Sequence, residues 1–355
     1  MARASLSKFA YKSLQVGKGL AGLAHKELST KIMELLAPGA VPSTEPVPSS
    51  LIEEVRKSIY KLEEIDWKES QEGIYPDNQL FEAPWLEWAK RYPLIWLDLP
   101  STWERRQNRN TQDIPKNIAR EIYPDYYLQN FHHQTDGYLS DHSAGLYDLQ
   151  VEILFNGTAD AMRRRILAPL KNGLKQFKER NPSSIRILDV ATGTGRTLQQ
   201  IKGSAPNAEL LGIDLSEAYL RQASNLLNKN QKSLVQLIRG NAERLPFINE
   251  SMQAITCVFL LHELPRKARQ NVINECWRVL EPGGTFVLAD SIQIEDSPKF
   301  SLLMENFHKG FHEPYYYDYI YDNINARLEQ ANFKEITANS FFMTRVWASK
   351  KPIGY

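Results

Sequence analysis

From about residue 185 onward, short apolar runs alternate with amphipathic helical patterns. The stretches 216–227 and 266–280 repeat their apolar residues at helical spacing. Strands that alternate with helices of this length indicate a parallel sheet with helices packed on both faces. The runs with strand-like composition are 185–190, 210–213, 234–238, 254–261 and 285–289.

The last two strand-like runs follow a different pattern. Residues 333–339 and 341–349 are separated by almost nothing, which predicts an antiparallel hairpin. We therefore predict an α/β fold with a doubly wound, mostly parallel, seven-stranded sheet that this hairpin closes. A helical or irregular accessory region precedes it at the N-terminus.

The residues before the sheet divide into segments of different composition. The opening segment has a local net charge of +4 over residues 1–34 and predicts one or two amphipathic helices. Residues 37–50 contain four prolines, which predicts a semi-extended linker. A helix is expected at 51–62. Five of the seven tryptophans then stand among prolines, which predicts a compact, irregular accessory region or lid. The predicted division is 1–36, 37–50, 51–140 and a cofactor-binding domain at 141–355.

Apolar residues gather on one side of the predicted N-terminal helix. A basic amphipathic start is typical of a targeting peptide, of a peripheral contact with a membrane, or of a helix packed on its own protein; these alternatives stay open. A second basic run, MRRR at 162–165, predicts a solvated helix face. The apolar side comprises Leu6, Phe9, Ala10, Leu14, Leu20, Leu23 and Ala24.

Composition excludes several classes of protein. The 43 Lys and Arg residues balance 42 Asp and Glu residues, so no global field attracts nucleic acid. No apolar run reaches the roughly 18 residues that a membrane-spanning helix needs. Cys257 and Cys276 lack CxxC spacing, so we expect neither a disulfide scaffold nor a zinc site, and a cytoplasmic location is the natural one.

A glycine-containing turn follows the first predicted strand. Glycines at a strand-to-helix turn let the backbone approach a ligand, and Gly193 and Gly195 stand there. Asp214 ends the second strand, 19 residues after Gly195, where a carboxylate can accept hydrogen bonds from ribose hydroxyls. Together these residues favour a nucleoside-bearing cofactor over a simple turn with a capping aspartate.

The details of the turn distinguish between cofactors. A dinucleotide fingerprint requires a third glycine three residues after Gly195, but Leu198 stands there. Asp189 precedes the turn, where a carboxylate suits an amino group better than a pyrophosphate.

Four stretches resemble the motifs of the class I S-adenosylmethionine (SAM)-dependent methyltransferases. LDVATGTG at 188–195 resembles their first motif, with Ala191 where many members have glycine. LGIDLS at 211–216 resembles the second motif, and GNAERLPF at 240–247 is similar to the adenine-binding turn, with Asn241 where Asp is commoner. RVLEPGGTFVLAD at 278–290 resembles the approach to the fifth strand.

The resemblance implies roles for individual residues. Asp189 and the amides of the turn would hold the amino-acid end of the cofactor, and Asp214 would bind the ribose. Leu215 would pack on the adenine, whose edge would bond to Asn241 and Ala242. The implied cofactor-binding set is Asp189, Ala191, Gly193, Gly195, Asp214, Leu215, Asn241 and Ala242.

His262 is the leading candidate for a catalytic base. It follows the fourth predicted strand, at the edge of the sheet where ligands bind in open α/β folds. The alternative is that His262 or Glu263 caps the next helix. We predict that an insertion after the fifth strand lines the substrate pocket, where His308 and His312 would share one helix face and no metal is expected. The predicted substrate-binding residues are Tyr138, His308, His312, Tyr315 and Tyr316.

The core most resembles the ubiquinone/menaquinone C-methyltransferase type. This implies SAM-dependent methyl transfer to a small, hydrophobic or aromatic acceptor. A nucleic-acid acceptor is not expected, because no Asn/Asp-Pro-Pro-Tyr/Phe motif follows the fourth strand. The alternatives are a nicotinamide-dependent oxidoreductase and a cofactor-binding protein without turnover, and the oligomeric state is left open.

Overall fold

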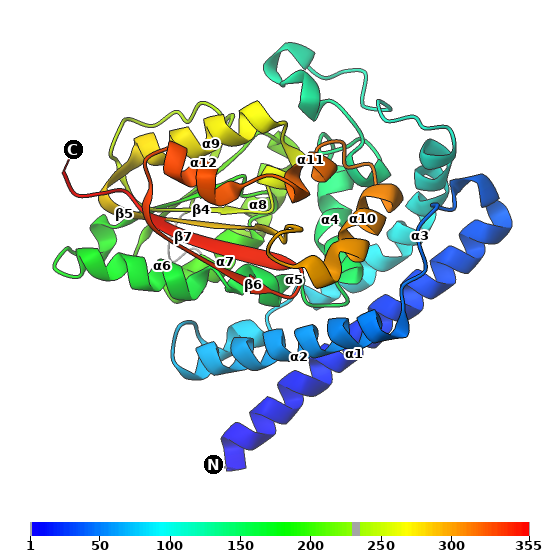
Figure 1. Ribbon diagram of the computed structural model, residues 1–355, viewed down its shortest axis with the longest axis horizontal. Coiled ribbons are helices and arrows are strands. Elements are labelled where there is room, and N and C mark those ends of the chain that lie inside the picture. The colour runs from blue at the N-terminus through cyan, green and yellow to red at the C-terminus, as the bar shows by residue number, and fades with distance from the viewer. Residues whose placement is uncertain (1, 229–234, 355) are drawn as a thin grey trace.

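A computed structural model describes residues 2–228 and 235–354. One seven-stranded sheet forms its centre, with the strand order β3-β2-β1-β4-β5-β7-β6 (Figure 1). β1 to β5 run parallel, and β7 pairs antiparallel with both β5 and β6. The predicted fold class is confirmed. The strands are β1 Arg186–Val190, β2 Glu209–Asp214, β3 Gln236–Arg239, β4 Met252–Val258, β5 Leu280–Ser291, β6 Lys334–Phe341 and β7 Thr344–Lys350.

The observed strands differ from the predicted ones mainly at their ends. β4 stops at Val258, and Phe259 then takes a positive φ of 57°, so the following residues turn away from the sheet. As a result, His262 lies on a short 3-10 turn, Leu261–Glu263, at the carboxyl end of β4. The predicted third strand includes Leu234, which lies outside the described residues.

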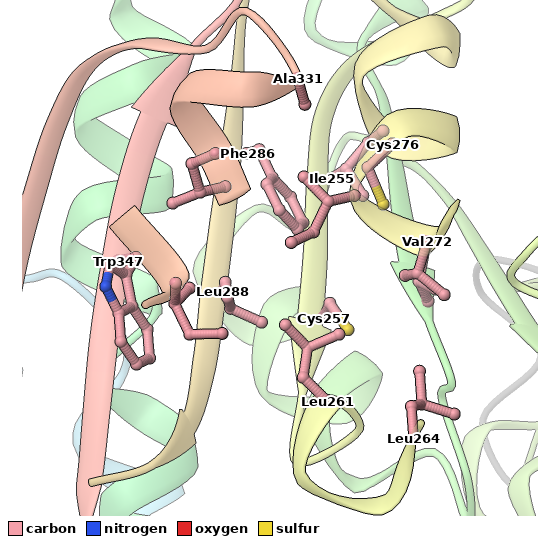
Figure 2. Packing of buried hydrophobic residues seen from close by; sticks show 14 of the residues in the cluster. Ile255, Cys257, Leu261, Leu264, Val272, Cys276, Phe286, Leu288, Ala331 and Trp347 are labelled. Carbon is pink, nitrogen blue, oxygen red and sulfur yellow. The ribbon is translucent and has the colours of Figure 1, made fainter. Parts of the chain in front are cut away.

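Helices cover both faces of the sheet (Figure 1). One apolar cluster joins the sheet to α9, α11 and α12, and Figure 2 shows its packing around Ile255, Cys257 and Phe286. A second cluster joins the other face to α6, α7 and α8. These helices are α6 Leu167–Leu174, α7 Arg196–Ser204, α8 Glu217–Leu227, α9 Arg266–Val279, α11 Tyr316–Ile320 and α12 Ile324–Gln330.

The tryptophan-rich region is helical, so the prediction of an irregular region is wrong over much of its length. α2 spans Ser49–Gln71, and α3 spans Trp85–Gln107 with Pro93 and Pro100 inside it. An internal proline costs a helix about 3 kcal/mol. Burial of Trp88 and Trp103 from the same helix offsets that cost, because tertiary packing can override local propensity. Short 3-10 turns connect α3 to α4 (Asp141–Leu154), which precedes α5 (Ala159–Arg164).

The opening segment forms one continuous helix, α1 (Ala2–Leu36), which crosses α2 outside the sheet domain (Figure 1). Its predicted apolar side faces solvent: Phe9 and Leu20 are 70% and 63% exposed. The opposite side packs on the protein through Tyr11 and Met33. A helical wheel cannot show which side a neighbouring helix covers, and here polar contacts with α2 decide it.

A buried ion network ties α2 to α5 and the residue after it. Both oxygens of Asp66 accept hydrogen bonds from Arg164, at 2.8 and 2.6 Å, and Arg165 also donates to Asp66. Tyr11 of α1 donates a further bond of 2.7 Å to Asp66. The prediction of a solvated face for MRRR is therefore wrong, because Arg163, Arg164 and Arg165 are all buried. Burial would raise the pKa of Asp66, but the two guanidinium groups outweigh it and lower that pKa to about 2.

Candidate functional site

A cleft opens at the carboxyl ends of the parallel strands, between the loops that follow β1 to β4. The turn after β1 borders one side, and the residues after β2 and β3 border the other. The cleft brings together six of the residues predicted to bind the cofactor. They are Ala191, Gly193, Asp214, Leu215, Asn241 and Ala242.

The turn after β1 has the backbone geometry of a ligand cradle. Ala191, Gly193 and Gly195 all have positive φ, at 56°, 54° and 82°. A Cβ on Gly193 would meet no atom within 4 Å, so this glycine leaves the cleft open. Gly195 instead precedes α7, and a Cβ there would lie 3.0 Å from Ala223 of α8. Gly193 thus leaves space for a ligand, whereas Gly195 allows close packing.

Asp214 is held at the end of β2 with its carboxylate beside the turn. Its oxygens accept hydrogen bonds of 2.8 Å from the backbone N–H groups of Gly193 and Ser216. Burial raises the pKa of Asp214 to about 6, against the lowering effect of these bonds. The carboxylate therefore lies at the cleft wall with capacity for further bonds from hydroxyl donors.

Asp189 lies behind the turn rather than on the cleft wall. Its two oxygens accept bonds from the hydroxyls of Thr192 and Thr256, at 2.7 and 2.6 Å, and only 1% of the residue is exposed. Burial raises its pKa to about 7. In this arrangement Asp189 holds the turn through Thr192.

The residues that follow β3 form a polar and compact wall of the cleft. The side-chain oxygen of Asn241 accepts a 2.8 Å bond from the backbone N–H of Glu243, which fixes the orientation of the side chain. Leu215 and Ala242 add apolar surface beside it. These groups present one hydrogen-bonding edge and apolar contacts, which suit a flat heterocycle.

Tyrosines from the accessory region and α8 cover the cleft. Tyr138, a predicted substrate-binding residue, lines this cleft, where its hydroxyl donates to Glu263. The sequence reasoning missed the other tyrosines, although it predicted an accessory region or lid at 51–140. Their signal was the PDYY run at 124–127, which precedes the sheet domain by some 60 residues. The lining tyrosines are Tyr126, Tyr127, Tyr138, Tyr147 and Tyr219.

A second, smaller chamber adjoins the cleft beyond β4 and β5. The two cavities share Tyr147, Phe259 and Glu263 as walls. The chamber also contains His262 and Tyr316, whose hydroxyl lies 2.9 Å from the Oγ of Ser291. Its remaining walls are mostly apolar, so it fits a small ring better than a charged molecule.

Asp290 fixes the orientation of His262. The Nδ1 of His262 lies 2.6 Å from Oδ1 of Asp290, whose other oxygen accepts a bond from the N–H of Leu261. Burial would lower the pKa of His262, but the charge of Asp290 outweighs it and raises that pKa to about 9. The sequence reasoning did not include Asp290, because the final residue of the RVLEPGGTFVLAD stretch is 28 positions from the histidine.

Three predicted substrate-binding residues, His308, His312 and Tyr315, do not line this chamber. α10 spans Ser301–Gly310, so His312 lies beyond its end and does not share a helix face with His308. The ring of His308 packs near Tyr317, and His312 contacts Gln129 at 2.7 Å. Tyr315 lies outside the chamber and packs against Tyr126, so only Tyr316 of this group lines it.

A larger cavity of about 660 Å³ continues from the chamber toward the N-terminal helices. It shares His132, Tyr147 and Phe307 with the chamber. Its outer wall comes from α1 and α3, including Met33 and Trp103. The accessory helices thus line a cavity that adjoins the chamber, which in turn adjoins the cleft.

Comparisons with known proteins agree with this geometry. Residues 187–284 match a family described as a methyltransferase domain. A demethylmenaquinone methyltransferase of Thermotoga maritima is 34% identical over 152 residues, which cover 43% of this chain and 59% of that protein. A ubiquinone/menaquinone biosynthesis C-methyltransferase of Desulfotalea psychrophila is 31% identical over 151 residues, or 42% of this chain and 56% of that protein.

Solved structures also match. Human N-acetylserotonin methyltransferase in complex with SAM is 15% identical, with a TM-score of 0.39 over 59% of this chain and 58% of that one. The chain spans less than two thirds of the two curated relatives named above. The family match over residues 187–284 and the curated relatives support a class I SAM-dependent methyltransferase domain and do not favour a nicotinamide oxidoreductase.

Proposed function

We propose that this protein transfers a methyl group from SAM to a small, hydrophobic or aromatic acceptor. The observation that carries the proposal is the common wall between the cleft and the chamber. Tyr147, Phe259 and Glu263 belong to both cavities, so two ligands bound there would meet at one point. The other residues of the cleft and the chamber fit the two ligands separately.

The residues of the cleft fit SAM in their chemistry. The open side of Gly193 accepts a close ligand, and Asp214 offers oxygens to ribose hydroxyls. Leu215 and Ala242 flank a position for adenine beside Asn241. Asp189 contributes indirectly, since its oxygens are taken up by two threonine hydroxyls.

When bound, SAM supplies an electrophilic methyl group on a positively charged sulfur. The chain positions the acceptor against it, and alignment of reacting atoms can account for much of a rate enhancement. The tyrosines over the cleft and the apolar chamber walls exclude water from this point. His262, oriented by Asp290 and protonated below its pKa of about 9, would donate a hydrogen bond to the acceptor, and its neutral form above that pKa would take the acceptor's proton.

The chamber and the relatives point to the same class of acceptor. Tyr316 and Ser291 supply hydroxyls among apolar walls, as a ring that carries oxygen atoms would require. Two matched relatives are named for menaquinone or ubiquinone biosynthesis. An acceptor with a quinol-like ring is therefore the first to test.

Labelled SAM tests the proposed reaction. The protein is incubated with SAM that carries a radioactive methyl group, together with separate lipid and aqueous extracts of cells. The proposal expects label in an organic-soluble product of the lipid extract, and none with boiled protein. Tight binding of SAM without label transfer to any fraction would favour a protein without turnover.

A peripheral contact with a membrane through α1 is supported by the exposed apolar side of that helix. Leu6, Phe9, Leu20 and Leu23 lie on this side and are all more than half exposed. The lysines of the same stretch do not face the same way: Lys12 pairs with Glu63 of α2 at 3.0 Å. Among the described residues, no helix is long and apolar enough to cross a membrane.

A further inference from the structure

Three side chains that can coordinate a metal ion lie close together beside the chamber, although they are far apart in the sequence. His132 lies before α4, Glu263 follows β4, and Glu313 follows α10. The Nδ1 of His132 is 2.8 Å from Oε1 of Glu313, and its Nε2 is 3.7 Å from Oε1 of Glu263. One potential ligand atom from each residue lies within 4.8 Å of the other two.

Glu313 is the unusual member of this group. Its side chain is fully buried, yet neither carboxylate oxygen accepts a hydrogen bond from any residue in 2–228 or 235–354. His132 forms an ion pair with Glu313, because the two glutamates outweigh burial and raise the pKa of His132 to about 10, but the approach of its ring lacks hydrogen-bond geometry. A buried carboxylate without a donor is costly unless it is paired with a cation or coordinates a metal.

We propose that His132, Glu263 and Glu313 bind a divalent transition-metal ion. One imidazole and two carboxylates form a mixed nitrogen and oxygen set that suits Mn²⁺, Fe²⁺ or Zn²⁺. An ion bound by one ring nitrogen of His132 and by the two carboxylates would give both oxygens of Glu313 a partner. Three protein ligands leave further coordination positions open.

Neighbouring contacts hold the ligands in place. The hydroxyl of Tyr138 donates to Glu263, which fixes one carboxylate from the cleft side. The backbone N–H of His132 donates a 3.0 Å bond to the carbonyl of His312, next to Glu313. His132 keeps a left-handed backbone, with φ of 56°, that this bond supports. Such supporting contacts are typical of metal sites, where they orient the ligands.

The site has a defined position relative to the reaction. Glu263 borders both the cleft and the chamber, and His132 borders the chamber. The open positions of a bound ion would accept an oxygen atom of the acceptor. This role rests on the proposed function, whereas metal binding itself depends only on the three side chains. The sequence predicts no metal here because the ligands stand at 132, 263 and 313, without a recognisable spacing.

Metal uptake by the full chain tests the proposal. The protein is treated with a chelator, dialysed against micromolar free Mn²⁺ or Zn²⁺, and its metal content is measured by mass spectrometry. We expect one ion per chain, and an affinity more than about tenfold weaker in Glu313→Gln. His142→Gln is the matched control, since it removes a half-exposed histidine that lies outside the cluster.

Spectroscopy of the wild type keeps the test independent of whether a variant folds. Bound Mn²⁺ should show electron spin echo modulation from one imidazole nitrogen, and His132→Gln should lose it. Failure of the folded wild type to take up stoichiometric metal would overturn the proposal, and would leave a buried ion pair between His132 and the two glutamates. Equal uptake by folded Glu313→Gln, or bound Mn²⁺ without nitrogen modulation, would also overturn it. Binding of S-adenosylhomocysteine, measured separately, reports on the proposed function.

Discussion

At the scale of single residues, substitution of His262 distinguishes a chemical role of this histidine from a structural one. We predict that His262→Ala lowers single-turnover methyl transfer above pH 9 by about 10²–10⁴-fold, the usual contribution of a general base, because His262 is neutral only above its pKa of about 9. The affinity for S-adenosylhomocysteine should hardly change, because His262 lines the chamber and not the cleft. His142→Ala serves as the control. A variant that melts at lower temperature but turns over normally per folded molecule would assign His262 to capping.

Asp214 makes cofactor binding depend on pH. Its carboxyl group has a pKa of about 6 in the unliganded protein, raised by burial. The ionised form accepts hydrogen bonds from hydroxyls better than the protonated form does, so affinity for S-adenosylhomocysteine should rise as pH increases from 5 to 7 and then level off. Titration calorimetry at several pH values measures this. Asp189 titrates in the same range, so a dependence that persists unchanged in Asp214→Asn would contradict the assignment.

At the scale of elements, Asp66 links α2 to the residues that precede α6. We predict that Asp66→Asn lowers the free energy of unfolding by about 3–5 kcal/mol, because it leaves buried Arg164 without its counter-charge and buried Arg165 with Glu69 alone. Glu64→Gln is the matched control on the same helix. Its ion pair with Lys8 is partly exposed, so about 0–1 kcal/mol is expected. Denaturant unfolding compares the two, and equal losses would refute the role of the buried network.

The outer side of α1 can be tested without disturbing the fold. We predict that the double variant Leu20→Asp/Leu23→Asp loses co-sedimentation with lipid vesicles but keeps the wild-type melting temperature, since both side chains are more than half exposed. Leu86→Asp places the same charge on an exposed leucine of α3 and should bind vesicles normally. Because lysines of α1 pair with α2, binding should depend only weakly on anionic lipid. If the wild-type protein does not bind vesicles, the proposed membrane contact is contradicted.

Elements with a strong local pattern were predictable, and those decided by long-range contacts were not. The β-strands of the sheet domain and the final hairpin follow from apolar runs and short connections. α3 was not recognised, because its prolines are local breakers and its stability comes from burial of Trp88 and Trp103. Which side of α1 faces solvent could likewise not be predicted, because the orientation of the helix depends on the pairing of Tyr11 with Asp66.

At the scale of the whole molecule, the candidate site is a set of joined cavities that no single motif describes. That Gly193, Asp214 and Asn241 line one cleft was largely predictable, because they follow strand ends that meet at one edge of the sheet. The chamber was predictable only at His262 and Tyr316. Asp290 of β5, Glu313 after α10 and His132 before α4 lie at or beside it, and only the tertiary fold brings them together.

The most direct test of the central claim is titration calorimetry with S-adenosylhomocysteine. We predict binding in the micromolar range to the wild type, weaker by about 1.5–3 kcal/mol in Asp214→Ala through the loss of charge-assisted hydrogen bonds. NAD⁺ titrated into the same protein should give no heat of binding. An absence of heat with S-adenosylhomocysteine, or equal affinity in the wild type and Asp214→Ala, would contradict the assignment of the cleft.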